Sequence, residues 1–301
     1  MPIWGIDLGG TKIECVVLKS AVDPEVIARE RINTEAEQEY EHILQQISTL
    51  IDRVSQRTGL NPERIGFGTP GTLDPTSGAM KNCNTTSLNG KPLDVDLEKK
   101  LEVSVRIAND ANCFALAETR MGAVPDQAPN AEVVFGVILG SGVGGGVVVN
   151  GKIINGRHGI GGEWGHNFLD ESGGPCYCGK TGCVERILSG KNLERYHLET
   201  FGEEKKLVTI YQEFLDKSNS NSITTIDRMI HFFGKAMSVV INILDPDVIV
   251  LGGGVGNIDL LYTAGAEEVK KHVFNPSLNT SFLKPKLGDS AGVFGAAFLV
   301  S

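Results

Sequence analysis

The alternation of apolar runs and glycine clusters predicts two α/β halves with the same beginning. Each half opens with a buried strand, a glycine turn and a second strand. The residues are 3–8, 9–10 and 13–18 in the first half, and 133–139, 140–146 and 147–149 in the second. Later strands are expected over 64–67 and 248–251, each running into a glycine-containing loop. We therefore expect two related domains that face each other across a cleft.

Helical spacing marks the longer elements between these strands. Apolar residues from Tyr40 to Val54 recur every three or four positions, and Gly59 follows them, which predicts a helix that ends there. Further helices are expected over 110–121, 222–244 and 290–300, the last returning to the first domain. The polar segment 124–130 contains two prolines and predicts the boundary between the halves. The expected domains are 1–122 with 289–301, and 123–288.

The amino-acid composition mainly excludes some classes of partner. The 301 residues include 28 Lys and Arg against 37 Asp and Glu, a net charge of −9. This balance argues against nucleic acid as a partner, because domains that bind the phosphate backbone usually carry a basic excess. No apolar run is long enough for a membrane helix, and the N-terminus lacks the basic region of a signal peptide. We expect a cytoplasmic protein without a membrane partner.

The first glycine turn is a candidate phosphate loop. Its sequence is DLGGTK, and the candidate residues are Asp7, Gly9, Gly10, Thr11 and Lys12. Glycines expose backbone N–H groups to phosphate oxygens, and the Thr hydroxyl adds a donor. The carboxylate of Asp7 would suit a hydrated Mg²⁺ that bridges phosphates. An ordinary hairpin turn explains the same residues equally well.

The second glycine turn, GSGVGGG over 140–146, contributes the candidates Gly140, Ser141, Gly142 and Gly144. It matches the dinucleotide pattern G-x-G-x-x-G, which requires a helix after the glycines. A predicted strand follows instead, so the turn belongs to a hairpin and the Rossmann interpretation is rejected. Two hairpin loops of this kind, one in each half, could bind a nucleotide from both sides.

A cluster of cysteines lies in the second half. Residues 174–181 match the P-loop pattern, but the preceding DESG is not a strand, which a P-loop requires. Cys176, Cys178 and Cys183, with His166 upstream, instead form the Cys₃His donor set of a structural zinc site. Three reduced thiols without metal are the alternative.

Polar residues near these motifs could bind a polyol or act on it. Zinc would hold Glu163 and Glu185 near one point, where their carboxylates could accept hydrogen bonds from hydroxyls. Solvated carboxylates are an equally good interpretation of the spacing. Asn109 and Asp110 follow an apolar run and begin a predicted helix. Asp110 could be a helix cap or a general base, and the local sequence leaves both open.

Together these motifs resemble the ROK family, which groups sugar kinases with sugar-responsive repressors. The resemblance covers almost the whole chain. The matching segments are DLGGTK at 7–12, GFGTPG at 66–71, NDAN at 109–112, GSGVGGG at 140–146, GEWGH at 162–166, CYCGKTGCVE at 176–185 and DPDVIVLGGG at 245–254. Within the family, the chain looks most like bacterial fructokinases and mannokinases, on the segments 81–93, 163–167, 175–180 and 242–254. N-acetylglucosamine kinases share several of these segments.

The resemblance implies an actin-like, ribonuclease H-like, two-domain ATPase fold with ATP and a sugar in the cleft. At matching positions, Asp110 would be the catalytic base. Sugar hydroxyls would be held by Asn109, Glu163, His166 and Glu185, with Gly71 and Asn84 nearby. His166 would place one ring nitrogen on zinc and the other toward the sugar.

On the nucleotide side, the resemblance assigns phosphates and Mg²⁺ to Asp7, Gly10, Thr11 and the loop 140–144. Gly253 and Gly254 would lie under the adenosine. Relatives suggest a homodimer.

The implied activity is ATP-dependent phosphorylation of the 6-hydroxyl of a hexose, with D-fructose as the expected substrate. Alternatives within the family are N-acetylglucosamine kinase, glucokinase and mannokinase. A sugar-binding repressor is disfavoured, because the first phosphate strand begins at Ile3 and leaves no room for a preceding DNA-binding domain. A binding protein without turnover is the third alternative.

Overall fold

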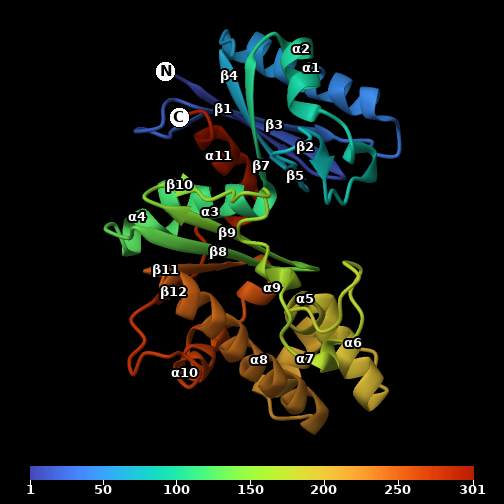
Figure 1. Cartoon of the computed structure of the whole chain (residues 1–301), viewed down its shortest axis with the longest axis vertical. Helices are drawn as coiled ribbons and strands as arrows, with labels where there is room; N and C mark the ends of the chain where they lie inside the picture. The colour runs from blue at the N-terminus through green and yellow to red at the C-terminus, as the bar shows by residue number, and fades with distance from the viewer. The chain divides into compact units, whose positions relative to one another are not determined.

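The computed structural model describes all 301 residues of the chain, apart from the side chain of Asp289. Contacts between residues divide the chain into two compact units (Figure 1). Unit 1 comprises Met1–Pro129, Gly146–Gly161 and Lys286–Ser301, and unit 2 comprises Asn130–Gly145 and Gly162–Pro285. The domain boundaries expected from the sequence stay a prediction.

The main sheet of unit 1 is mixed and has the order β3-β2-β1-β4-β7. Its strands are β1 (Ile3–Leu8), β2 (Lys12–Leu18), β3 (Val26–Asn33), β4 (Arg64–Thr69) and β7 (Ser104–Asn109). Strands β1, β2 and β3 pair antiparallel, whereas β1, β4 and β7 run parallel. A short hairpin joins β5 (Thr72–Leu73) to β6 (Met80–Lys81). The parallel strands place the carboxyl ends of β1, β4 and β7 at one edge of the sheet.

Both faces of this sheet are covered by helices. Alternate side chains of β1, such as Trp4 and Ile6, belong to a core that includes α1 (Tyr40–Thr58) and α2 (Leu93–Leu101). On the opposite face, Gly5 and Gly66 allow α11 (Ala291–Phe298) to lie directly on the sheet, because a Cβ at either position would overlap its backbone. Helix α11 also packs against α3 (Asp110–Arg120). The C-terminal helix thus returns to the first unit, as expected.

A second mixed sheet has the order β10-β9-β8-β11-β12. Its strands are β8 (Val133–Leu139), β9 (Val143–Val149), β10 (Lys152–Ile153), β11 (Val248–Gly252) and β12 (Ser281–Leu283). Strand β11 runs parallel to both β8 and β12. Strands β8 and β9 are sheet neighbours joined by Gly140–Gly142, which confirms the hairpin predicted for this glycine turn.

The helices of unit 2 gather around α8 (Ser220–Leu244), which contacts α5, α6, α7 and α10. Their bounds are α5 (Glu185–Leu188), α6 (Gly190–Phe201), α7 (Leu207–Leu215), α9 (Gly253–Gly256) and α10 (Ala264–Lys270). The 3₁₀ helices of the chain are η1 (Thr86–Leu88), η2 (Trp164–His166), η3 (Glu171–Gly173), η4 (Asp259–Tyr262) and η5 (Gly288–Ser290).

Two local expectations need correction. Gly144 was expected in the glycine turn but lies within β9, which begins at Val143. The polar segment 124–130 was expected as a break, yet it contributes to a short helix, α4 (Ala123–Gln127). The buried carboxylate of Glu118 accepts the N–H of Ala123 at 2.8 Å and stabilises the start of this helix.

Within the part of the chain that the structure describes, no helix combines the length and apolar character needed to cross a bilayer.

Candidate functional site

In unit 1, Asp7 lies at the end of β1 among other charged groups. Burial raises the pKa of its carboxyl to about 7, with further increases from the carboxylates of Asp110 and Glu14, while Arg31 opposes them. A glycine of α11 leaves space around the carboxylate of Asp7. A Cβ at Gly292 would lie 3.0 Å from its Oδ2. A bound cation would favour the charged form of this carboxyl and offset the cost of its burial.

Asp110 is the first residue of α3, directly after β7. Its Oδ1 accepts the N–H of Ala111 at 2.7 Å, and Asn109 also accepts that N–H and caps the helix. Solvent reaches the side chain, but the surrounding protein desolvates the carboxyl and raises its pKa, although hydrogen bonds from Ala111 and Asn109 oppose this. A carboxylate that is accessible and more basic than usual can act as a general base. The capping function belongs mainly to Asn109.

The first glycine turn connects β1 to β2 in unit 1. The N–H of Gly9 donates to the carbonyl of Lys12 at 3.0 Å and closes the turn, so this donor is not available to a phosphate. Thr34 steadies the turn through a hydroxyl that donates to the Gly9 carbonyl at 2.7 Å. Gly10, Thr11 and Lys12 are exposed at its tip. The tip is therefore the part that could contact an anion.

Gly71 and Asn84 lie together in the same unit. The N–H of Asn84 donates to the carbonyl of Pro70 at 3.2 Å, and the Asn84 side chain is exposed. A Cβ at Gly71 would lie 2.5 Å from the Sγ of Cys83, so this position accepts only glycine without rearrangement. The loop thus brings the two residues close to each other, and their place beside the sugar stays a prediction.

The second glycine turn, Gly140–Gly142, is held within unit 2 by residues that follow the cysteine cluster. The N–H of Val143 donates to Oε2 of Glu185 at 3.0 Å, and a Cβ at Gly142 would lie 2.7 Å from the same oxygen. At the start of α6, the N–H of Gly190 donates to the carbonyl of Gly140 at 2.8 Å. The turn is therefore held by the first residues of α5 and α6, and Ser141 at its tip is exposed.

Gly253 and Gly254 lie where β11 passes into α9. Gly253 has φ +80°, and a Cβ there would overlap the carbonyl of Leu139, whereas a Cβ at Gly254 would meet no atom within 4 Å. Only glycine fits the first position. At Gly254, the absence of a side chain leaves the backbone accessible from the neighbouring pocket.

A pocket of about 600 Å³ in unit 2 joins these glycines to the second turn. Its size is typical of a site for a small molecule or cofactor. Its lining residues come from the second turn, α6, α7 and α9, and are Gly140, Ser141, Gly190, Lys191, Glu194, Lys206, Leu207, Val208, Tyr211, Gly254, Val255, Asn257 and Ile258. Apolar walls with two lysines at the rim suit a nucleotide, whose base is flat and whose phosphates are anionic.

Sequence reasoning missed most of this lining. Tyr211, Val255 and Ile258 read as ordinary apolar positions of helices or loops, and nothing in their spacing relates them to the glycine turn. Lys206 lies just before α7 and pairs with Glu194 at 3.1 Å. The structure places the first residues of α6 and α7, Gly190 and Leu207, at this pocket.

The cysteine cluster assembles as expected from its spacing. The ligand atoms of His166, Cys176, Cys178 and Cys183 all lie within 4.8 Å of one another. The Sγ atoms of Cys178 and Cys183 are 3.6 Å apart, and the Sγ of Cys176 is 3.7 Å from Nδ1 of His166. Tetrahedral zinc with Zn–S bonds of ~2.3 Å requires S–S separations of ~3.7 Å. The donor set and its spacing therefore fit zinc.

His166 uses its two ring nitrogens differently. Nδ1 faces the thiols, and Nε2 lies 3.0 Å from the hydroxyl of Tyr177, whose ring meets the imidazole edge to face. Tyr177 is 77% exposed, so solvent or a ligand can displace its hydroxyl from Nε2. Glu163 is half-buried and directly precedes the 3₁₀ turn η2 that carries His166. The histidine thus links the cysteine cluster to a polar, accessible surface.

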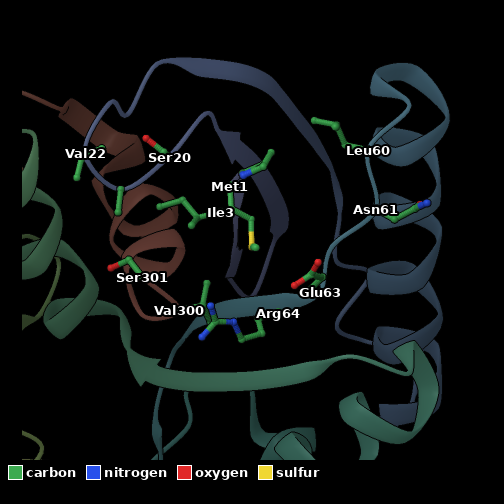
Figure 2. Close-up of a pocket in the computed structure, with 12 residues that line it drawn as sticks. Met1, Ile3, Ser20, Val22, Leu60, Asn61, Glu63, Arg64, Val300 and Ser301 are labelled. Atoms are coloured by element: carbon green, nitrogen blue, oxygen red, sulfur yellow. The ribbon is translucent and has the colours of Figure 1, made fainter.

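A second hollow, of about 380 Å³, lies on unit 1 beside both chain termini (Figure 2). Figure 2 shows Met1 and Ile3 near Val300 and Ser301, with Arg64 beside Val300 and with Leu60 and Asn61 on the opposite side. None of the predicted site residues lines it.

Comparison with known proteins gives a consistent result. A family model described as the ROK family matches residues 3–301. The chain is similar to the N-acetyl-D-glucosamine kinase of Vibrio cholerae serotype O1, with 36% identity over 98% of each chain. It is also similar to the ROK hexokinase of Thermus thermophilus, with a TM-score of 0.87 and 30% identity over 99% of this chain and 97% of that one.

A ROK family glucokinase from Streptomyces griseus, solved with glucose and AMPPNP, has a TM-score of 0.77 and 24% identity, and the match covers 99% of both chains. At that identity the similarity concerns the fold alone.

Proposed function

The chain belongs to the ROK family, with the two-domain actin-like ATPase fold of its sugar kinases, and from this premise we propose that it phosphorylates N-acetyl-D-glucosamine with ATP. One observation carries the choice of acceptor: the chain is 36% identical to an N-acetyl-D-glucosamine kinase over nearly the full length of both proteins. Sugar kinase activity in general is supported by the same relatives. The fructose expected from segments 81–93, 163–167, 175–180 and 242–254 has less support, because the similar proteins from Vibrio cholerae and Vibrio atlanticus are N-acetyl-D-glucosamine kinases.

In the proposed reaction Asp110 is the general base. It accepts the proton of the sugar 6-hydroxyl as that oxygen forms a bond to the γ-phosphorus of ATP. The bond from this phosphorus to the β,γ-bridging oxygen breaks, and ADP leaves. The raised pKa of Asp110 supports this role, because a more basic carboxylate accepts a proton more readily. Asn109 holds the carboxylate at the start of α3.

The remaining chemistry of phosphoryl transfer is charge neutralisation and positioning. Mg²⁺ that accompanies ATP supplies charge neutralisation at the phosphates. Asp7 would hold this ion through water, and its unusually high pKa without a cation supports the assignment. Gly10, Thr11 and Lys12 of the first turn, and Ser141 and Gly142 of the second, would contact phosphate oxygens.

The adenosine would occupy the pocket of unit 2. Gly253 and Gly254 would pass beneath it, and the apolar side chains of Leu207 and Val255 would contact the base. On the sugar side, Glu163, His166 and Glu185 would accept or donate hydrogen bonds to hydroxyls, with Asn84 and Gly71 completing the acceptor site. A neutral polyol explains why carboxylates and amides dominate this set.

We further propose that His166, Cys176, Cys178 and Cys183 hold a structural zinc ion. Four protein ligands leave no open position, so the ion would act on the fold and not on the reaction. It would fix the segment that carries Glu163 and Glu185. A homodimer and a cytoplasmic location stay predictions.

The test is the release of ADP with Mg-ATP and a panel of acceptors: N-acetylglucosamine, N-acetylmannosamine, glucose, mannose and fructose. We expect the highest kcat/KM with N-acetylglucosamine, and Asp110→Asn serves as the control for contaminating kinases. A higher kcat/KM with fructose would overturn the acceptor but keep the kinase. The absence of turnover with every sugar would favour a binding protein.

A further inference from the structure

A second group of potential metal ligands lies in unit 2, outside the residues proposed for catalysis. It consists of His231 on α8, Glu268 on α10 and His272 just after α10. Their ligand atoms lie within 4.8 Å of one another. Nδ1 of His231 is 3.1 Å from Oε1 of Glu268, and Nε2 of His272 is 3.2 Å from the same oxygen. One carboxylate oxygen therefore faces two imidazole nitrogens.

The packing of two helices brings these side chains together. Gly234 of α8 permits the close approach, because a Cβ there would lie 2.5 Å from Cγ of Glu268. Glu268 and His272 are four positions apart, so they project from one side of the chain, and His231 faces them from α8. The two imidazole rings have centroids 5.8 Å apart. A bound ion would join the two helices.

The charges around the group suit a divalent ion. Lys271 pairs with Oε2 of Glu268 at 2.6 Å and leaves Oε1 directed toward the histidines. An outer partner that holds one carboxylate oxygen while the other binds metal is a common arrangement. The side chains of His231 and His272 are 46% and 26% exposed, so an ion can enter from solvent.

We propose that His231, Glu268 and His272 form a site for a divalent transition-metal ion such as Zn²⁺. Two imidazoles and one carboxylate suit Zn²⁺, Ni²⁺ or Cu²⁺, whereas Mg²⁺ prefers oxygen ligands and retains its water. Three protein ligands leave positions for water, so the ion exchanges readily with solvent. This distinguishes the site from the four-ligand cysteine cluster.

The experiment is calorimetric titration with Zn²⁺ of full-length protein whose cysteine cluster has first been loaded with zinc and then dialysed. We expect one further equivalent per chain, in the presence of excess Mg²⁺. His231→Gln and His272→Gln should each weaken this binding at least about tenfold. Loss of a residue that only supports a metal ligand already weakens binding by about that factor, and loss of a ligand should cost no less. Zn²⁺ should raise the Tm of the parent protein but not of the double variant.

The matched control is His42→Gln, because His42 forms a single histidine–carboxylate pair with Glu35 at 2.7 Å and has no second imidazole in its group. This variant should keep the further equivalent. The proposal is overturned if no further equivalent binds, or if it survives in the double variant. The variants alter exposed or half-exposed side chains, and an unchanged Tm without zinc shows that they fold.

Discussion

Glu185 offers a sharp test, because its carboxylate connects the residues proposed for the sugar to the turn proposed for phosphates. Its Oε2 accepts the N–H of Val143 at 3.0 Å and lies against Gly142. A residue that only bound sugar would not influence nucleotide binding in the absence of sugar. Glu185→Ala should do so, because it leaves the amide at the end of the turn without its acceptor.

The size of the effect follows from this hydrogen bond. A bond to a charged group contributes about 1.5–3 kcal/mol, and Glu185 is only half-buried, so the lower end applies. Because 1.4 kcal/mol is a factor of ten in affinity, Glu185→Ala should weaken ATP binding roughly tenfold. Glu185→Gln keeps an oxygen that can accept the N–H. It loses only the charge assistance, and about a twofold effect is expected.

The assay is calorimetric titration of the sugar-free enzyme with a non-hydrolysable ATP analogue and Mg²⁺. Glu163→Ala is the control, since it removes the other carboxylate proposed for the sugar without touching the turn contact to Val143. We expect it to leave the nucleotide affinity unchanged. The reasoning is refuted if Glu185→Ala binds the analogue as tightly as the parent, or if Glu185→Gln is as impaired as Glu185→Ala.

Three further predictions concern the base, its pH dependence and a glycine. Asp110→Asn should lower kcat about 10²- to 10⁴-fold with little change in the KM of the sugar, measured by steady-state kinetics; a kcat within tenfold of the parent contradicts the assignment. Because the pKa of Asp110 is raised and the base must be deprotonated, kcat/KM should fall as the pH drops through that raised value. Its acid limb should lie above the range of an ordinary Asp, and a profile flat down to pH ~4 would exclude Asp110 as the base. Gly253→Ala should lower the free energy of unfolding by more than about 1–2 kcal/mol, because φ is +80° and the Cβ would overlap Leu139. Gly254→Ala should leave Tm within about 2 °C, because its Cβ would meet no atom within 4 Å. Thermal unfolding of both glycine variants measures this difference, and equal Tm values for the two would contradict the predicted strain at Gly253.

Local sequence was sufficient for elements whose conformation depends on neighbouring residues. The apolar spacing from Tyr40 to Val54 predicted α1, and Gly59 ends it with φ 70°, where a side chain would be strained. Glycines between apolar runs likewise predicted the turn at 9–10 and a second hairpin turn, which was expected over 140–146 and ends at Gly142. The cysteine cluster was also predicted, because three of its four ligands lie within eight residues and the chain between them is short.

Only the tertiary structure decided contacts between segments far apart in the chain. The interaction of Asp7 with Asp110 joins strand β1 to the start of helix α3, and the pairing of Glu185 with Val143 joins a helix to a turn 42 residues away. Local spacing could not tell whether Asp110 was a cap or a base; in the structure Asn109 is the N-cap of α3, and the role of Asp110 as a base stays a proposal.

The group of His231, Glu268 and His272 shows most clearly the difference between local sequence signals and long-range packing. Glu268 and His272 share a helical spacing, but His231 joins them only because Gly234 lets α10 pack closely on α8. Backbone preference and periodicity act over a few residues, and they determined where the strands, turns and helices of this protein form. The pKa values, pockets and ligand groups arise from distances between elements, which long-range packing alone determines.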